Sequence, residues 1–176
     1  NVYFREPESR ADQTRMMSIV TTGSETGYYV DVFRSRKERG GDKMHDYFYH
    51  NLGQTMTLTA ADGTDLNLQP TEELAFAGAH LYGYSYLYDK KVAATGKDVK
   101  ATFTIDMKDK GGDDIVMNLW MKGEPDRDVF TALSPMTEGL SRTPGMPYNI
   151  KEQPSLTFVV RHHGEAWTRA IDVVYE

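Results

Sequence analysis

The sequence predicts an all-β protein, an antiparallel β-sandwich of about ten strands connected by long loops. Apolar and polar residues alternate with a period of two in many short segments, and clusters of turn-forming residues separate these segments. The clearest alternation places Phe103 and Ile105 on one face of a strand and Thr104 on the other. No segment of the sequence shows the convincing apolar period of an amphipathic helix. These observations together favour strands along the whole chain.

The first part of the chain predicts an edge strand, a short strand and a long β-hairpin. Residues 2–4 are apolar and indicate the edge strand, and residues 15–22 indicate the short strand. Residues 27–52 predict two strands joined by a charged link with two adjacent glycines, which adopt positive φ at no steric cost. Phe33 and Phe48 lie on these two strands, and we expect both side chains to be buried.

The second part of the chain predicts three further pairs of strands. They are 54–60 with 64–68, 102–107 with 115–121, and 156–162 with 167–175. Residues 127–133 predict one more strand. The segment 70–91 has no clean period, and 134–154 holds four of the seven prolines and therefore predicts a long loop.

Composition limits the class of protein. The chain has 176 residues, of which 39% are hydrophobic and 26% charged, which is typical of one globular domain spanning residues 1–176. The net charge of -6 argues against nucleic-acid binding, because phosphate contacts need clustered basic residues. The sequence has no cysteine, which excludes disulfides and thiol nucleophiles, and no apolar run approaches the roughly 20 residues of a membrane span.

The second strand of the long hairpin carries more titratable groups than folding requires. Between residues 45 and 50 the chain places two histidines, an aspartate and two tyrosines. Alternation sends His45 and Tyr47 to one face, about 7 Å apart, and sends Asp46 and His50 to the other. These two histidines and the aspartate cannot converge on one metal ion without a bulge. We therefore predict no metal site and no cofactor, and a divalent metal stays open as an alternative.

Tyrosines recur at every second position from residue 82 to residue 88. On one face of an extended segment, rings such as those of Tyr84 and Tyr86 would form a platform for the apolar faces of sugar rings. The alternative is an edge segment with half-buried phenols and wet hydroxyls. A basic run that begins at Arg34 would attract an acidic polysaccharide in spite of the negative net charge, or it is simply a solvated turn.

Two motifs resemble a known family of enzymes. The first is Val-Asp-Val-Phe-Arg at 30–34, then Gly-Gly, then His-Asp-Tyr-Phe-Tyr-His at 45–50, and the second is the tail 156–176. Both are similar to the β-sandwich region of heparinase II/III-like polysaccharide lyases, which follows an α-helical toroid in that family. The Asn/His pair and the catalytic tyrosine that the family places in the toroid have no counterpart in this chain.

The resemblance implies a function and a set of partners. We expect the chain to be the β-sandwich domain at the C-terminal end of a larger lyase. Together with an upstream helical toroid it would support β-elimination of uronate-containing polysaccharides, and alone it would be inactive. The alternative is a non-catalytic carbohydrate-binding or structural module. The implied partner is an acidic polysaccharide, and the implied location is periplasmic or extracellular. His45 and Tyr47 are the candidate acid/base residues. The candidate substrate-binding residues are Arg34, His50, Tyr84 and Tyr86.

Overall fold

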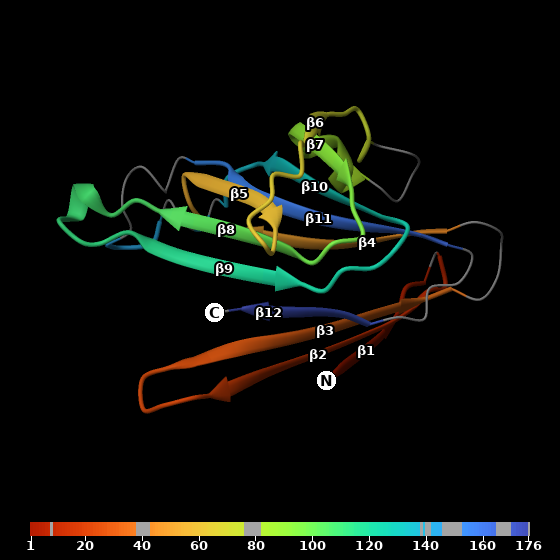
Figure 1. Ribbon diagram of the computed structural model, residues 1–176, viewed down its shortest axis with the longest axis horizontal. Helices are drawn as coiled ribbons and strands as arrows, with labels where there is room; N and C mark the ends of the chain where they lie inside the picture. The colour runs from red at the N-terminus through yellow and green to blue at the C-terminus, as the bar shows by residue number, and fades with distance from the viewer. Residues whose placement is uncertain are drawn as a thin grey trace.

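The described strands form two antiparallel sheets that pack face to face, which confirms the predicted β-sandwich (Figure 1). The computed structural model describes residues 1–7, 9–37, 43–75, 82–137, 139, 142–145, 153–164 and 170–175, the last six by their backbone. Sheet A has the strand order β1-β2-β3-β12-β9-β8-β5, and sheet B has the order β4-β11-β10-β7-β6. In the described part of the chain, no helix is long and apolar enough to cross a membrane.

The elements have the following bounds. Sheet A contains β1 (Val2–Arg5), β2 (Asp12–Thr21), β3 (Gly27–Arg36), β5 (Thr55–Ala60), β8 (Val99–Ile105), β9 (Ile115–Met121) and β12 (Ala170–Tyr175). Sheet B contains β4 (Lys43–Asn51), β6 (Gln69–Pro70), β7 (Tyr88–Ala94), β10 (Arg127–Ser134) and β11 (Ser155–Gly164). Two short 3-10 helices, η1 (Tyr82–Tyr86) and η2 (Lys108–Lys110), complete the described elements.

The main core lies between the two sheets and follows from the alternation seen in the sequence. Phe103 of β8 and Leu119 of β9 point inward from sheet A and meet Phe158 and Val160 of β11 from sheet B. All four side chains are at most 1% exposed. Burying an apolar side chain of this size contributes roughly 1.5–3 kcal/mol, so this layer supplies much of the driving force for folding.

Sheet B is covered on both of its faces. On the face turned away from sheet A, Phe130 and Val159 pack with Leu74 and Leu87, which belong to the segment between β6 and β7. The strand β11 is therefore buried on both sides, which explains the nearly continuous apolar run in its sequence.

Two predicted hairpins are wrong. The strand β3 pairs with β2 and β12, and β4 pairs with β11, so the segment 27–52 crosses from sheet A to sheet B instead of folding back on itself. The tail behaves in the same way, because β11 lies in sheet B and β12 lies in sheet A. Alternation shows which residues share a face but does not show which strand is the neighbour, and this is why the pairing was missed.

Other predictions of local structure have mixed outcomes. The edge strand β1, the strand β2 and the antiparallel pair β8–β9 are confirmed. The predicted strand 64–68 is reduced to one isolated bridge between Thr59 and Asp65. The tyrosine-rich segment forms the 3-10 helix η1, so the extended ladder is wrong. Much of the predicted loop 134–154 lies outside the described residues.

Phe33 and Phe48 are half-buried rather than fully buried, and they pack on different layers. Phe33 borders the core between the sheets, where its ring lies 5.6 Å from that of Tyr47. Phe48 borders the outer cluster of sheet B. Because β3 and β4 belong to different sheets, the two rings contribute to different clusters.

A buried arginine holds two of the links that cross between the sheets. The Arg127 side chain donates hydrogen bonds to the backbone carbonyls of Thr95 and Lys97, which follow β7, and of Lys122, which follows β9. Only 4% of Arg127 is exposed, and burial lowers the pKa of its guanidinium. These carbonyls lie just beyond the ends of β7 and β9, and the arginine donates hydrogen bonds to them where the chain leaves one sheet for the other.

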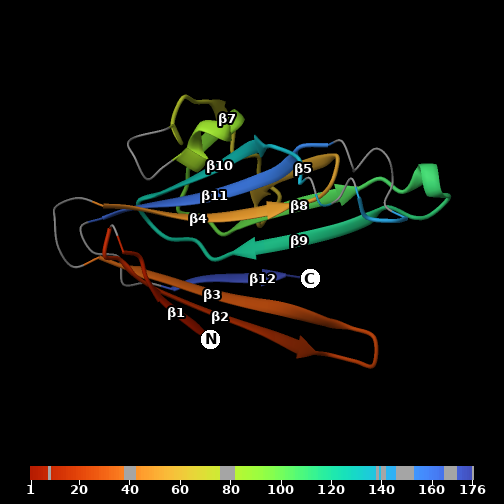
Figure 2. The same cartoon turned by 180° about the vertical axis from the view of Figure 1, so that it is seen from behind.

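Sheet A extends beyond sheet B on the side of β1, β2 and the start of β3 (Figures 1 and 2). The strand register places five large apolar side chains on the inward face of this extension, and each is at least half exposed. We call them the open strip: Val2, Phe4, Met17, Ile19 and Tyr29.

Candidate functional site

The predicted site residues lie in three separate places. His45 and Tyr47 point into the space between the sheets, while His50, Tyr84 and Tyr86 lie over the outer face of sheet B. Arg34 is exposed and, since it alternates with the inward-facing Phe33, it points away from sheet B. The structure therefore brings His50, Tyr84 and Tyr86 together on the outer face, keeps His45 with Tyr47 in the interior, and leaves Arg34 apart from both groups.

The inward pair lies in a polar cluster between β3 and β4. The Tyr47 hydroxyl donates to Asp31 Oδ2 at 3.0 Å, and His45 Nδ1 lies 2.9 Å from Ser35 Oγ. Tyr47 is 3% exposed and His45 is 6% exposed. Their spacing on one face agrees with the alternation, but both side chains are buried and have hydrogen-bond partners inside the fold.

Asp31 is the centre of that cluster and was not singled out from the sequence. Its carboxylate is fully buried and also accepts hydrogen bonds from the guanidinium of Arg15, with Nε 3.0 Å from both oxygens. A buried carboxylate is tolerated only when it is paired and hydrogen-bonded, and here Arg15 and Tyr47 provide both conditions. An aspartate among the apolar residues of this strand was the available signal. Its partners come from β2, whose pairing with β3 was not predicted, and from β4, which was expected beside β3 in a hairpin and instead faces it across the core.

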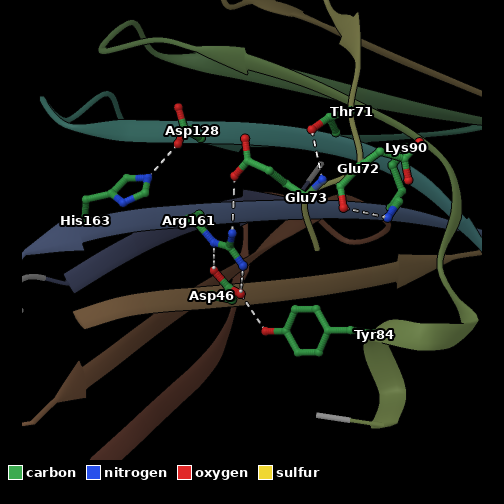
Figure 3. A network of polar contacts seen from close by, with 9 residues as sticks. All are labelled: Asp46, Thr71, Glu72, Glu73, Tyr84, Lys90, Asp128, Arg161 and His163. Atoms are coloured by element: carbon green, nitrogen blue, oxygen red, sulfur yellow. Dashed lines mark hydrogen bonds and ion pairs between the residues drawn. The ribbon is translucent and has the colours of Figure 1, made fainter. Parts of the chain in front are cut away.

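A second polar network lies on the outer face of sheet B (Figure 3). Arg161 of β11 and Asp46 of β4 are direct cross-strand neighbours, and two guanidinium nitrogens of Arg161 each lie 2.8 Å from a carboxylate oxygen of Asp46. The same arginine reaches Glu73 at 3.4 Å. Hydrogen bonding to Asp46 raises the pKa of Arg161, so its guanidinium remains charged.

Tyr84 joins the network and fixes η1 to the sheet. Its hydroxyl donates to Asp46 Oδ2 at 2.5 Å, and its ring meets the ring of Phe48 edge-on at 5.3 Å. Burial, and then the charge of Asp46, raise the pKa of this phenol well above its ordinary value of 10.0. Tyr84 is therefore a neutral anchor at neutral pH, and its predicted part in sugar binding stays a prediction.

A pocket of about 350 Å³ opens beside this anchor, between η1 and sheet B. We call it the η1 pocket. Its described lining residues are Phe48, His50, Gly83, Tyr86, Leu87, Ser134 and Pro135. Two of the predicted substrate-binding residues, His50 and Tyr86, thus meet in one cavity although they are far apart in the sequence.

The floor of the η1 pocket is hydrogen-bonded. His50 Nδ1 lies 3.0 Å from the hydroxyl of Thr157, its direct neighbour across β4 and β11, and Ser134 Oγ lies 3.0 Å from the same hydroxyl. Burial lowers the pKa of His50 from 6.5, so its imidazole is neutral at neutral pH. Thr157 was missed in the sequence, where the one polar residue between Leu156 and Phe158 was the available signal.

No metal centre is visible in the described residues, which hold no group of three or more histidine, aspartate or glutamate side chains suited to an ion. His45 and His50 lie on opposite faces of β4, as the alternation predicts, and Asp46 is occupied by Arg161 and Tyr84.

The chain is similar to part of a curated enzyme. It is 31% identical over 178 aligned residues to an endo-acting ulvan lyase from Formosa agariphila, and the match covers 99% of this chain. The chain spans about a fifth of the length of that relative, 20%. It is thus related to one segment of a polysaccharide lyase. No family model matches, so the resemblance to heparinase II/III-like lyases stays a prediction, and no solved structure matches.

Proposed function

We propose that this chain is a non-catalytic β-sandwich module of a polysaccharide lyase. It supports β-elimination of uronate-containing polysaccharides by a catalytic domain that lies elsewhere in the parent polypeptide, for which the resemblance suggests a helical toroid. The observation that carries the proposal is the match of nearly the whole chain to only a fifth of an endo-acting ulvan lyase.

The chemistry of β-elimination supports a non-catalytic role. The reaction needs a base for the proton beside the uronate carboxyl group, an acid for the leaving oxygen, and a group that stabilises the developing negative charge. His45 and Tyr47 are buried and bonded to Ser35 and Asp31. On the outer face, the acidic and basic groups of Asp46 and Arg161 neutralise one another.

The name of the relative suggests which polymer to test first. That enzyme is an ulvan lyase, and we propose an acidic polysaccharide of this kind as the partner of the parent protein. Because such polymers are too large to cross a membrane unaided, we also propose a periplasmic or extracellular location.

The isolated chain tests this proposal directly. Purified protein is incubated with ulvan, heparan sulfate and alginate, and the absorbance of the unsaturated product is followed. We expect no turnover, since no acid, base and charge-stabilising group meet on an exposed surface of the described residues. Clear turnover that disappears in a folded His45→Ala variant would overturn the proposal and make the interior cluster an active site.

A further inference from the structure

We propose that the η1 pocket binds an uncharged sugar ring of the polysaccharide, which stacks on Tyr86 and hydrogen-bonds to His50. This inference rests on the proposed function, because it takes the ligand to be a unit of the polymer that the parent lyase recognises. It goes further by naming the site and the chemical class of the unit.

The shape and lining of the pocket suit one sugar ring. Its volume of about 350 Å³ lies within the range of small-molecule sites, roughly 300–1,000 Å³. Phe48, Leu87 and Pro135 provide apolar walls, and the ring of Tyr86 stands at the rim with 63% of the residue exposed. A pyranose has an apolar C–H face and a hydroxyl-bearing edge, so it matches an apolar wall with a few polar groups.

The polar groups of the pocket are few. Of the described lining residues, His50, Ser134 and Tyr86 carry polar side chains. Thr157 occupies one nitrogen of the His50 ring, Nδ1, and thereby orients the imidazole. Such an arrangement fixes the orientation of a ligand through one or two hydroxyl contacts, while the apolar walls supply contact area.

The lack of charged side chains among the described lining residues of the pocket favours an uncharged sugar unit. None of its described lining residues is an aspartate, glutamate, lysine or arginine. The nearby Arg161 is neutralised by Asp46 and Glu73, and Arg34 points away from sheet B. A carboxylate or sulfate placed in the pocket would lose its hydration without meeting a cation, which is costly. An uncharged ring does not incur this cost.

The pocket is also preformed. The Tyr84 hydroxyl holds η1 against Asp46, and the Tyr84 ring rests on Phe48, so one wall is anchored to the floor. Ser134 and Thr157 are at most 8% exposed and hydrogen-bonded to each other beneath the cavity. A site that is already ordered loses little conformational entropy when a ligand binds.

The test uses NMR titration of the whole chain with defined probes. The probes are the neutral methyl pyranosides of glucose, xylose and rhamnose, and the charged methyl glucuronoside. We expect one or more neutral glycosides to shift the amide signals of Gly83, Leu87 and Ser134, with the glucuronoside binding at least tenfold more weakly. Tyr86→Ala should lower the affinity about tenfold through loss of the aromatic contact, and Tyr86→Phe should preserve most of it.

The matched control is Tyr82→Ala. Tyr82 lies on the same short helix and is equally exposed at 63%, but it does not line the pocket. Its substitution should leave the affinity unchanged. The pocket inference is overturned if no neutral glycoside shifts these signals, if Tyr82→Ala weakens binding as much as Tyr86→Ala, or if the glucuronoside binds most tightly.

Retardation in gels that contain ulvan separates this inference from the proposed function. If the wild-type chain and Tyr86→Ala are retarded equally, the module binds the polymer elsewhere and the pocket inference fails. The proposed function is overturned by a different result, turnover of polymer by the isolated chain.

Discussion

His50 shows how one side chain acquires its properties from its neighbours. It lies on β4, opposite Thr157 of β11, and its ring stacks near that of Phe48 with the ring centroids 6.1 Å apart. Burial lowers its pKa from 6.5, because the charged imidazolium loses hydration in this environment. The protein therefore favours the neutral form of His50.

This environment predicts a pH dependence of stability. Between the lowered pKa of folded His50 and the ordinary value of 6.5, the unfolded chain binds more protons than the folded one. The contribution of neutral His50 is complete above pH 6.5 and is lost as the pH falls through the folded pKa. As the pH falls from 6.5 toward the lowered pKa of folded His50, we expect the free energy of unfolding to fall more steeply in the wild type than in His50→Gln.

Urea denaturation at several pH values measures that difference, and NMR titration of the His50 ring provides an independent check. An imidazole midpoint at or above 6.5 in the folded protein would contradict the assignment.

The residue types and positions of His45 and Tyr47 explain why they were candidates for acid/base catalysis in the sequence. His45 and Tyr47 have the right chemistry and share one face of β4, as alternation predicts. Their burial depends on β3 lying opposite β4 across the core, where Asp31 and Ser35 meet them. The residue types predicted a reactive pair. In the structure, hydrogen bonds to Ser35 and Asp31 of the opposite sheet occupy the two side chains.

At the scale of elements, the pair Asp46–Arg161 joins three parts of the chain. It bridges β4 and β11, and Asp46 also accepts the hydrogen bond that anchors η1 through Tyr84. Both side chains are only 9% exposed, and Phe130 of β10 lies beneath the guanidinium, 5.5 Å from it. The pair therefore lies where β4, β10, β11 and η1 meet.

This arrangement predicts a strong asymmetry between single and double substitutions. Asp46→Leu leaves the buried charge of Arg161 with only the half-exposed Glu73, and it should destabilise the protein by about 3–5 kcal/mol. The double variant Asp46→Leu/Arg161→Met removes both charges and should recover at least half of that loss. Urea denaturation midpoints provide the measurement.

The matched control is the more exposed pair formed by His163 and Asp128 on the same face, whose side chains are 46% and 21% exposed. His163→Ala should cost at most about 1 kcal/mol. The interpretation would be wrong if Asp46→Leu were as mild as this control, or if the double variant were less stable than the single one.

For the whole molecule, the decisive feature is that sheet B covers only part of sheet A. Phe158 at the centre of the sandwich is fully buried, whereas Met17 and Ile19 of the open strip are 56% and 68% exposed. All three residues lie on strands with an apolar face, so the difference comes from the placement of the second sheet rather than from the strands themselves.

We therefore predict that substitutions at these positions differ strongly in their cost to stability. Phe158→Ala should destabilise the chain by about 3–5 kcal/mol, since it removes a fully buried ring. The double variant Met17→Ser/Ile19→Ser should change the stability by at most about 1 kcal/mol, as is usual for exposed sites. Thermal and urea denaturation compare the variants, and a large loss in the double variant would mean that the strip is covered in the folded protein.

The sequence by itself determined the class of fold and the face on which most side chains lie. Alternation along β8 and β9 predicts which residues point inward, because successive side chains of a strand point to opposite faces. The same rule placed His45 with Tyr47 and separated them from His50. The residue types in the sequence also identified His50 and Tyr86 as candidate binding residues. The spacing of the tyrosines, however, predicted an extended ladder for Tyr86, which lies in a 3-10 helix.

Only the tertiary structure decided which strands are neighbours and which groups meet. A period of two is equally compatible with a hairpin and with a crossover between sheets, so it could not show that β3 and β4 face each other across the core. The partners of Asp31, the pairing of Asp46 with Arg161 and the cavity under η1 all depend on contacts between segments distant in the sequence. Such contacts are determined by the packing of two sheets and a covering segment, which no local pattern encodes.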